Sequence, residues 1–147
     1  MDIMGANFFR VVQMLHDRLH ANAVPIQLPI GAESDFRGII DLITMRAEIY
    51  YDDLGKDVRD EDIPAELLDQ AKEYHDKMVE AVCELDDDMA ETFLMGEEPT
   101  ADEIRAPIRT GTIACRFFPG MCGPPYRHNA QQPRLDHAVA STHSPVA

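Results

Sequence analysis

Two histidines and a run of aspartates are the first residues whose types and spacing could bind a metal ion. His16 and His20 are four residues apart, so a helix would place them on one face, but no third ligand accompanies them. The run Asp86-Asp87-Asp88 lacks the alternating ligands and the turn glycine of a calcium loop. We therefore interpret the histidines as surface residues and the aspartates as a solvated junction between two helices, and we predict no metal site.

The nucleophiles and bases of the chain form no recognisable catalytic set. Cys83, Cys115 and Cys122 are an odd number without the C-x-x-C spacing of a zinc site, so we expect the reduced thiols of a cytoplasmic protein. Carboxylate pairs are abundant, but no apolar pocket signal singles one out for acid–base catalysis. No Gly-x-x-x-x-Gly-Lys-Ser/Thr segment occurs that would cradle phosphates. We assign no catalytic residue.

The balance of charge argues against two classes of protein and points to an inserted module. The 147 residues include 13 basic and 27 acidic ones, for a net charge of -14, which repels a nucleic-acid backbone. No apolar run approaches the about 20 residues of a membrane-spanning helix, and no signal pattern opens the chain. From Glu48 to Glu103 there are 21 acidic and 4 basic residues, which indicates an acidic module between two near-neutral flanks.

The sequence pattern of the N-terminal flank predicts a helix followed by three strands. Apolar residues recur at helical spacing and should form one buried face: Phe8, Val11, Val12, Leu15 and Leu19. Asn7 can cap this helix, and its end is expected between residues 20 and 22. Apolar residues then alternate over 24–30, which predicts a strand, and Pro25 and Pro29 confine it to a sheet edge. Two further strands are expected at 36–43 and 47–51.

A long acidic helix is the main element expected in the middle of the chain. After a charged loop over 52–62, an apolar stripe predicts a helix from Pro64 to Leu85. Its outer face is acidic: Glu66, Asp69, Glu73, Asp76 and Glu80. These carboxylates could dock a basic partner surface or could simply keep the surface soluble, and the sequence leaves both open.

In the last third of the chain, the sequence signals for helices and strands are weaker. A short helix should run through Met89 to Leu94, and Thr100 with Glu103 forms a capping box for another one. Pro107 is expected to interrupt that helix. A strand over 113–122 and a helix over 132–141 should follow, and we expect the residues beyond position 115 to be less ordered than the acidic helix.

One set of segments carries a family resemblance: Met1–Val12, Val24–Glu33, Phe36–Leu42, Ala47–Lys56, Ile63–His75, Gly96–Thr100 and Cys122–Gly123. In these segments the sequence closely resembles translation elongation factor G, the ribosomal translocase of bacteria and organelles. The resemblance implies a fold class of α/β to α+β, namely the C-terminal part of a P-loop GTPase domain with an inserted acidic α+β subdomain. Residues 1–30 and 112–147 would belong to the GTP-binding domain, the latter degraded and poorly ordered, and residues 31–111 to the insert.

The same resemblance implies part of a guanine site. Met1-Asp2 matches the last two residues of the family motif Asn-Lys-x-Asp, so Asp2 would accept hydrogen bonds from guanine. A Ser-Ala loop after Cys-Gly supplies a second base contact in the family. Here Gly123 is followed by Pro124 and Pro125, and a proline has no N–H to donate, which puts that contact in doubt.

The resemblance also implies a role in protein synthesis. The full-length parent would bind GTP or GDP, with magnesium held by residues absent from this sequence, and would drive tRNA and mRNA through the ribosome. The acidic helix would contact the ribosomal stalk protein. Because the phosphate loop is missing, we expect the isolated chain to be inactive as a GTPase. The alternative is a non-catalytic acidic α+β module that docks a basic protein such as the stalk.

Overall fold

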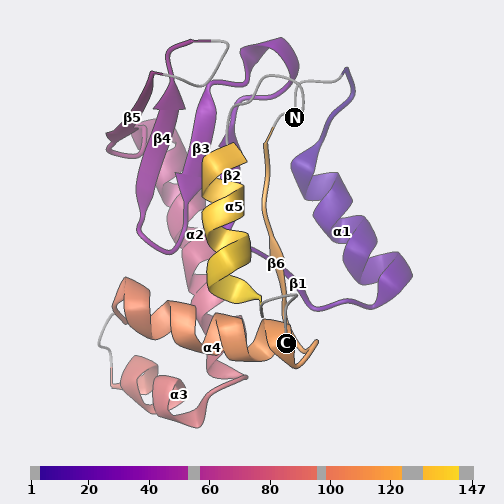
Figure 1. Ribbon diagram of the computed structural model, residues 1–147, viewed down its shortest axis with the longest axis vertical. Coiled ribbons are helices and arrows are strands. Elements are labelled where there is room, and N and C mark those ends of the chain that lie inside the picture. Colours follow the sequence, from indigo (N-terminus) through magenta and orange to yellow (C-terminus); the bar gives the residue numbers. More distant parts are fainter. Residues whose placement is uncertain (1–3, 53–56, 96–98, 124–130, 143–147) are drawn as a thin grey trace.

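The computed structural model describes residues 4–52, 57–95, 99–123 and 131–142 and shows a mixed α/β protein (Figure 1). The helices are α1 (Phe8–Leu19), α2 (Ala65–Cys83), α3 (Asp87–Leu94), α4 (Ala101–Ile113) and α5 (Gln131–Ser141). The strands are β1 (Ala23–Pro25), β2 (Gln27–Ile30), β3 (Gly38–Asp41), β4 (Arg46–Tyr50), β5 (Val58–Glu61) and β6 (Phe118–Gly120). A 3₁₀ turn spans Glu33–Asp35.

One extended segment connects a parallel and an antiparallel sheet. β1 pairs in parallel with β6, whereas β2, β3, β4 and β5 form an antiparallel sheet in that order. Ile26 joins the two sheets, because its N–H donates to the carbonyl of Gly120 and its carbonyl accepts from the N–H of Leu42. The predicted strand over 24–30 is therefore confirmed, and β2, which contains Pro29, lies at a sheet edge as predicted.

The helices enclose these sheets around a continuous core. α5 lies in front of β2 and β3, α2 lies behind the antiparallel sheet, and α1 runs beside β1 (Figure 1). The largest fully buried apolar side chains come from every third of the chain: Ile26, Leu28, Ile39, Ile40, Leu42, Met78, Val79, Val82, Ile104, Ile108 and Phe117. The acidic helix α2 is therefore packed into the same core as the near-neutral flanks.

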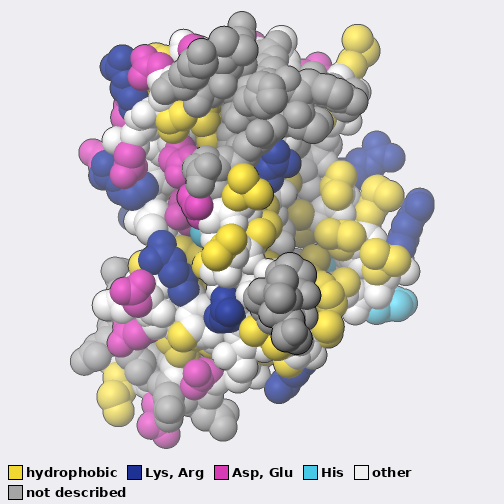
Figure 2. Space-filling view, in the orientation of Figure 1, with side chains coloured by type: hydrophobic (Ala, Val, Ile, Leu, Met, Phe, Trp, Pro, Cys, Tyr) yellow, Lys and Arg dark blue, Asp and Glu magenta, His cyan; other side chains and the backbone are white. Residues whose placement is uncertain are grey.

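The bounds of α1 are confirmed, but its buried face is narrower than predicted. Asn7 caps the helix by accepting from the N–H of Arg10, and His20 ends it in the left-handed conformation at φ 49°. Phe8 is buried, whereas Val11 and Leu19 are 55% and 68% exposed. The predicted five-residue face was wrong at these two positions, because α1 packs only along its side toward β1 and α2. Figure 2 shows hydrophobic side chains gathered over this helix.

The segment predicted as a charged loop over 52–62 contains β5, so that prediction was wrong. β5 pairs antiparallel with β4, with Ala47 opposite Glu61 and Ile49 opposite Arg59. Three of its four side chains are charged, and all but Glu61 are exposed, because it forms the sheet edge, where charges protect against further strand pairing. The guanidinium of Arg46 holds the edge by donating to Asp60 and Asp62.

Two other expectations are corrected in the last third. Pro107 does not break α4, which runs from Ala101 to Ile113 with Pro107 buried inside it. The missing hydrogen bond is offset by burial of the apolar face around Pro107 and by the capping box at Thr100. The strand expected over 113–122 is confined to β6, because Ile113 still belongs to the helix.

Replacing Thr100 by alanine should destabilise the protein by about 1 kcal/mol. The hydroxyl of Thr100 accepts from the N–H of Glu103, and the Glu103 carboxylate accepts from the N–H of Thr100, so the mutation removes the side-chain half of the capping box and loosens the other half. Urea unfolding measures the loss. Thr110→Ala, which removes the same atoms from an exposed interior position of α4, should change stability by less than half as much.

Cys122 provides a chemical test of whether the chain is folded beyond position 115. It is buried after the end of β6, and this burial raises the pKa of its thiol to about 12, so about one thiol in 10,000 is ionised at pH 8. We expect iodoacetamide to modify the exposed Cys115 and to spare Cys122 until the protein unfolds. Equal rates at the two cysteines in native buffer would contradict the packing of β6.

Candidate functional site

The residues predicted to touch guanine lie mostly outside the described part of the chain. Met1, Asp2, Pro124 and Pro125 are among the residues that the structure leaves undescribed. Gly123 is described and follows the end of β6, where it is partly exposed. The guanine contacts therefore stay a prediction.

The five predicted partner-binding carboxylates all lie on the solvent side of α2. Glu66, Asp69, Glu73, Asp76 and Glu80 are exposed. Their spacing places them on one stripe of the helix, opposite the buried residues Ala71, Met78 and Val82. We call these five carboxylates the acidic ridge. Its exposure means that the carboxylates are available to a partner surface.

One carboxylate of the ridge is already paired. Lys77 donates to Glu73 over 2.6 Å, one helical turn away, and this hydrogen bond raises the pKa of the lysine. The ammonium of Lys77 also lies 5.1 Å from the centre of the Tyr74 ring. The negative field of the ridge therefore comes chiefly from its other four members.

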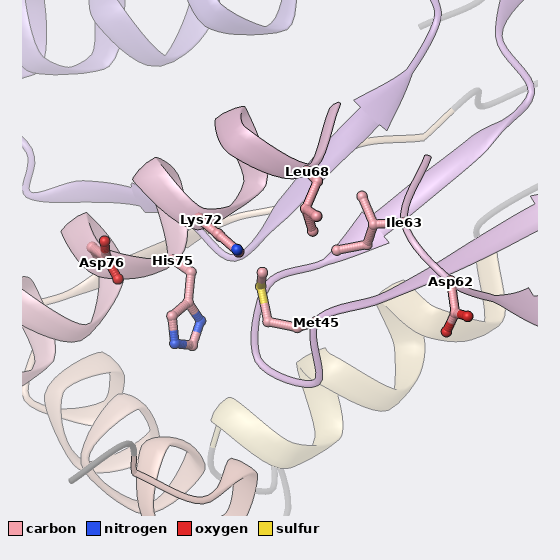
Figure 3. Close-up of a pocket in the computed structure, with 7 residues that line it drawn as sticks. All are labelled: Met45, Asp62, Ile63, Leu68, Lys72, His75 and Asp76. Carbon is pink, nitrogen blue, oxygen red and sulfur yellow. The ribbon is translucent and has the colours of Figure 1, made fainter. Parts of the chain in front are cut away.

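A first hollow lies beside the ridge on the side of the antiparallel sheet and has a volume of about 620 Å³. It is lined by Met45, Asp62, Ile63, Leu68, Lys72, His75 and Asp76, and we call it the lysine hollow. Figure 3 shows the Lys72 ammonium reaching toward Met45, with Asp62 and Asp76 at the margins. His75 is held in place because its Nδ1 lies 2.7 Å from the carbonyl oxygen of Leu42. The lining thus combines three charged and three apolar side chains with His75.

A second hollow lies on the other side of the ridge, between α1 and α2, with a volume of about 320 Å³. It is lined by Phe9, Val12, Gln13, His16, Ala23, Val24, Pro25, Tyr74 and Lys77, and we call it the aromatic hollow. The rings of Phe9 and Tyr74 are 5.5 Å apart, and β1 supplies the apolar floor. An apolar hollow with a few polar groups at its rim is the usual form of a binding pocket.

A third group of polar residues was not anticipated from the sequence. Asp41, Glu48, Arg105, Asp136 and His137 line a hollow of about 400 Å³ with Ala140. The Nε2 of His137 lies 3.9 Å from the Oδ2 of Asp41, and burial raises the pKa of Glu48. These residues come from β3, β4, α4 and α5, so no spacing in the sequence could have brought them together.

The prediction of no metal site concerns groups of ligands that would have to lie close together in the residues that the structure describes. In those residues, no group of three or more histidine, cysteine, aspartate or glutamate side chains could hold a metal ion. His16 lies at the rim of the aromatic hollow, and both His16 and His20 are exposed. Within the same ranges, no helix combines the length and apolar character needed to cross a membrane.

Comparison with known proteins supports the fold. No protein-family model matches the chain. A crystal structure of a protein from Thermus thermophilus is similar, with a TM-score of 0.80 and 22% sequence identity. The match covers 96% of this chain and 21% of the other, so the chain spans about a fifth of the length of that protein. At this identity, the likeness shows the fold alone.

Proposed function

We propose that the chain is part of a ribosomal translocase GTPase of the elongation factor G type, carrying the end of its GTP-binding domain and an inserted acidic subdomain. The topology of the two sheets is the observation that supports this most. The chain leaves a parallel strand at β1, builds an antiparallel sheet and α2 to α4, and returns to pair with β1 only at β6. A unit inserted between two neighbouring parallel strands has this arrangement.

Exposed apolar surface beside the parallel pair also supports the proposal. A parallel sheet is normally buried on both faces and has more than two strands. Here β1 and β6 form a pair, while Val11 and Leu19 of the adjacent α1 are largely exposed. The remaining strands of a GTP-binding domain, which residues outside this sequence would supply, account for both features. The small share of the Thermus protein that the chain covers agrees with this reading.

In this proposal the chain supplies residues that contact the guanine base and lacks the loop that binds the phosphates. Asp2 would accept hydrogen bonds from guanine, with Met1 and Gly123 nearby, while Pro124 and Pro125 weaken the second base contact for want of N–H groups. Phosphoryl transfer depends on the positioning of phosphates and magnesium. GTP hydrolysis and ribosomal translocation would therefore belong to the whole protein, in the cytoplasm or an organellar matrix.

Equilibrium binding of a fluorescent GDP tests this assignment. We expect the isolated 147-residue chain to show no saturable binding at micromolar nucleotide, because it has no phosphate loop. In the same experiment, a chain extended upstream in its own reading frame should bind. Sequencing about 400 bases upstream should reveal an in-frame Gly-x-x-x-x-Gly-Lys-Ser/Thr. Tight GDP binding by the isolated chain, or no such motif upstream, would refute the proposal.

The exposed acidic ridge favours a second candidate, a docking module for a basic protein such as the C-terminal domain of the ribosomal stalk protein. Clustered carboxylates steer a basic surface toward α2 and raise the association rate. An NMR titration with that domain should shift the amides around Glu66, Asp69 and Glu80. An unchanged spectrum over α2 would remove the stalk as the partner.

A further inference from the structure

We propose that the aromatic hollow is an anchor pocket for the partner that lies along the acidic ridge. It would take one apolar side chain, preferably aromatic, from a partner segment that also carries lysines or arginines. This inference rests on the proposed docking role of the ridge and adds what the partner must present. The partner class is thus a basic amphipathic segment with a single apolar anchor.

The chemistry of the lining favours an uncharged anchor. Phe9, Val12 and Tyr74 form the walls, and Val24 and Pro25 belong to the floor. By contrast, Asp62, Lys72 and Asp76 are charged groups among the seven residues of the lysine hollow. Binding of an apolar side chain therefore costs less desolvation free energy in the aromatic hollow than in the lysine hollow, because the water it displaces there lies mainly against carbon atoms.

The charged groups near the rim disfavour an anchor of either charge. Lys77 stands at the edge with its ammonium over the Tyr74 ring, so a cationic anchor would meet like charge. An anionic anchor would approach past the ridge and would be repelled by it. A neutral ring meets neither penalty, and it can pack against Phe9 and Tyr74, whose centres are 5.5 Å apart.

The hollow and the ridge can be engaged together because both belong to α2. Tyr74 follows Glu73 in sequence, and Lys77 follows Asp76, so the pocket opens within a helical turn of the carboxylates. A partner helix that places an aromatic residue in the hollow can place basic residues three and four positions away over the ridge. A central apolar anchor surrounded by charged contacts is the usual arrangement of an interface hot spot.

The absence of tryptophan from the sequence allows a direct test. The probe is a helical peptide of about 14 residues with one tryptophan and lysines three, four and seven positions away. On binding to the full chain, its tryptophan emission should shift to the blue. A peptide with alanine in place of tryptophan should bind about tenfold more weakly, and salt should weaken both.

Two variants that fill the hollow locate the anchor. Val12→Phe adds a ring to the wall and so narrows the hollow, whereas Gln13→Phe adds a ring at the exposed rim and blocks the entrance. If one substitution disturbs folding, the other still tests the anchor. Both should abolish the blue shift and weaken the tryptophan peptide about tenfold. Lys72→Met, which alters the lysine hollow on the same helix, should leave the shift intact. Circular dichroism confirms that each variant is folded.

Three results would overturn the inference. The alanine peptide could bind as tightly as the tryptophan peptide, the shift could persist in both filled variants, or it could disappear only in Lys72→Met. Each of these leaves salt-dependent docking on the ridge in place. Absence of any peptide binding would count against the ridge as well, whereas the GDP experiment tests the GTPase assignment independently.

Discussion

Replacing Asp69 and Glu80 by lysine together should weaken binding of the tryptophan–lysine peptide about 30- to 100-fold at low ionic strength. Both side chains lie on the exposed stripe of α2, and the double variant leaves three carboxylates and two ammonium groups where the ridge had five carboxylates, so most of the attraction for a basic partner is lost. Stopped-flow fluorescence should assign most of the loss to a slower association rate. The loss should shrink as salt is added.

A matched pair of substitutions separates the ridge from the overall charge. Asp35→Lys with Glu91→Lys makes the same change in net charge at exposed positions in the 3₁₀ turn and in α3. This control should reduce affinity by no more than a few-fold, since neither residue belongs to the acidic ridge. Equal losses in the two double variants would mean that the peptide responds to net charge and that the ridge is no docking surface.

Replacing Gly38 by alanine should destabilise the protein by about 3 kcal/mol. A methyl group at this position in β3 would collide with the carbonyl oxygen of Glu48 and lie 3.1 Å from the Cα of Ile49. Both are backbone atoms of β4, so the clash can be relieved only by moving one strand away from the other. Urea and thermal unfolding measure the effect.

Gly120→Ala is the control for this substitution. It also adds a methyl group to a strand, but its nearest neighbours would be atoms of Val24 and Pro25 at 3.4 Å, an ordinary contact distance. We expect a change within about 0.5 kcal/mol. Equal stability of the two alanine variants would contradict the close approach of β3 and β4 at Gly38.

Local features of the chain were predictable because neighbouring residues determine them. The Asn7 cap, the bounds of α1 and the capping box of Thr100 depend on residues within one helical turn of one another. The acidic outer face of α2 follows likewise from helical spacing and is exposed as expected. The acidic stripe of α2 could therefore be predicted from the sequence without any knowledge of tertiary contacts.

Features that depend on partners far along the chain were not predictable. The sequence of β5 has the charged pattern of a loop because the strand lies at a sheet edge. Only its hydrogen bonding to β4 makes this segment a strand. Pro107 should stop a helix by local rules, yet packing keeps α4 intact. The cluster of Asp41, Glu48 and His137 likewise requires that α5 return to the sheet.

The sequence by itself determined which residues are charged and which helical face they occupy, since a helix repeats every 3.6 residues whatever surrounds it. The tertiary structure alone decided that α1 and α2 lie side by side with β1 beneath them. Their separation in the chain, from Phe9 to Tyr74, leaves no periodic signal. The hollow beside the acidic ridge exists because these distant elements share one core, which the packing of apolar side chains selects.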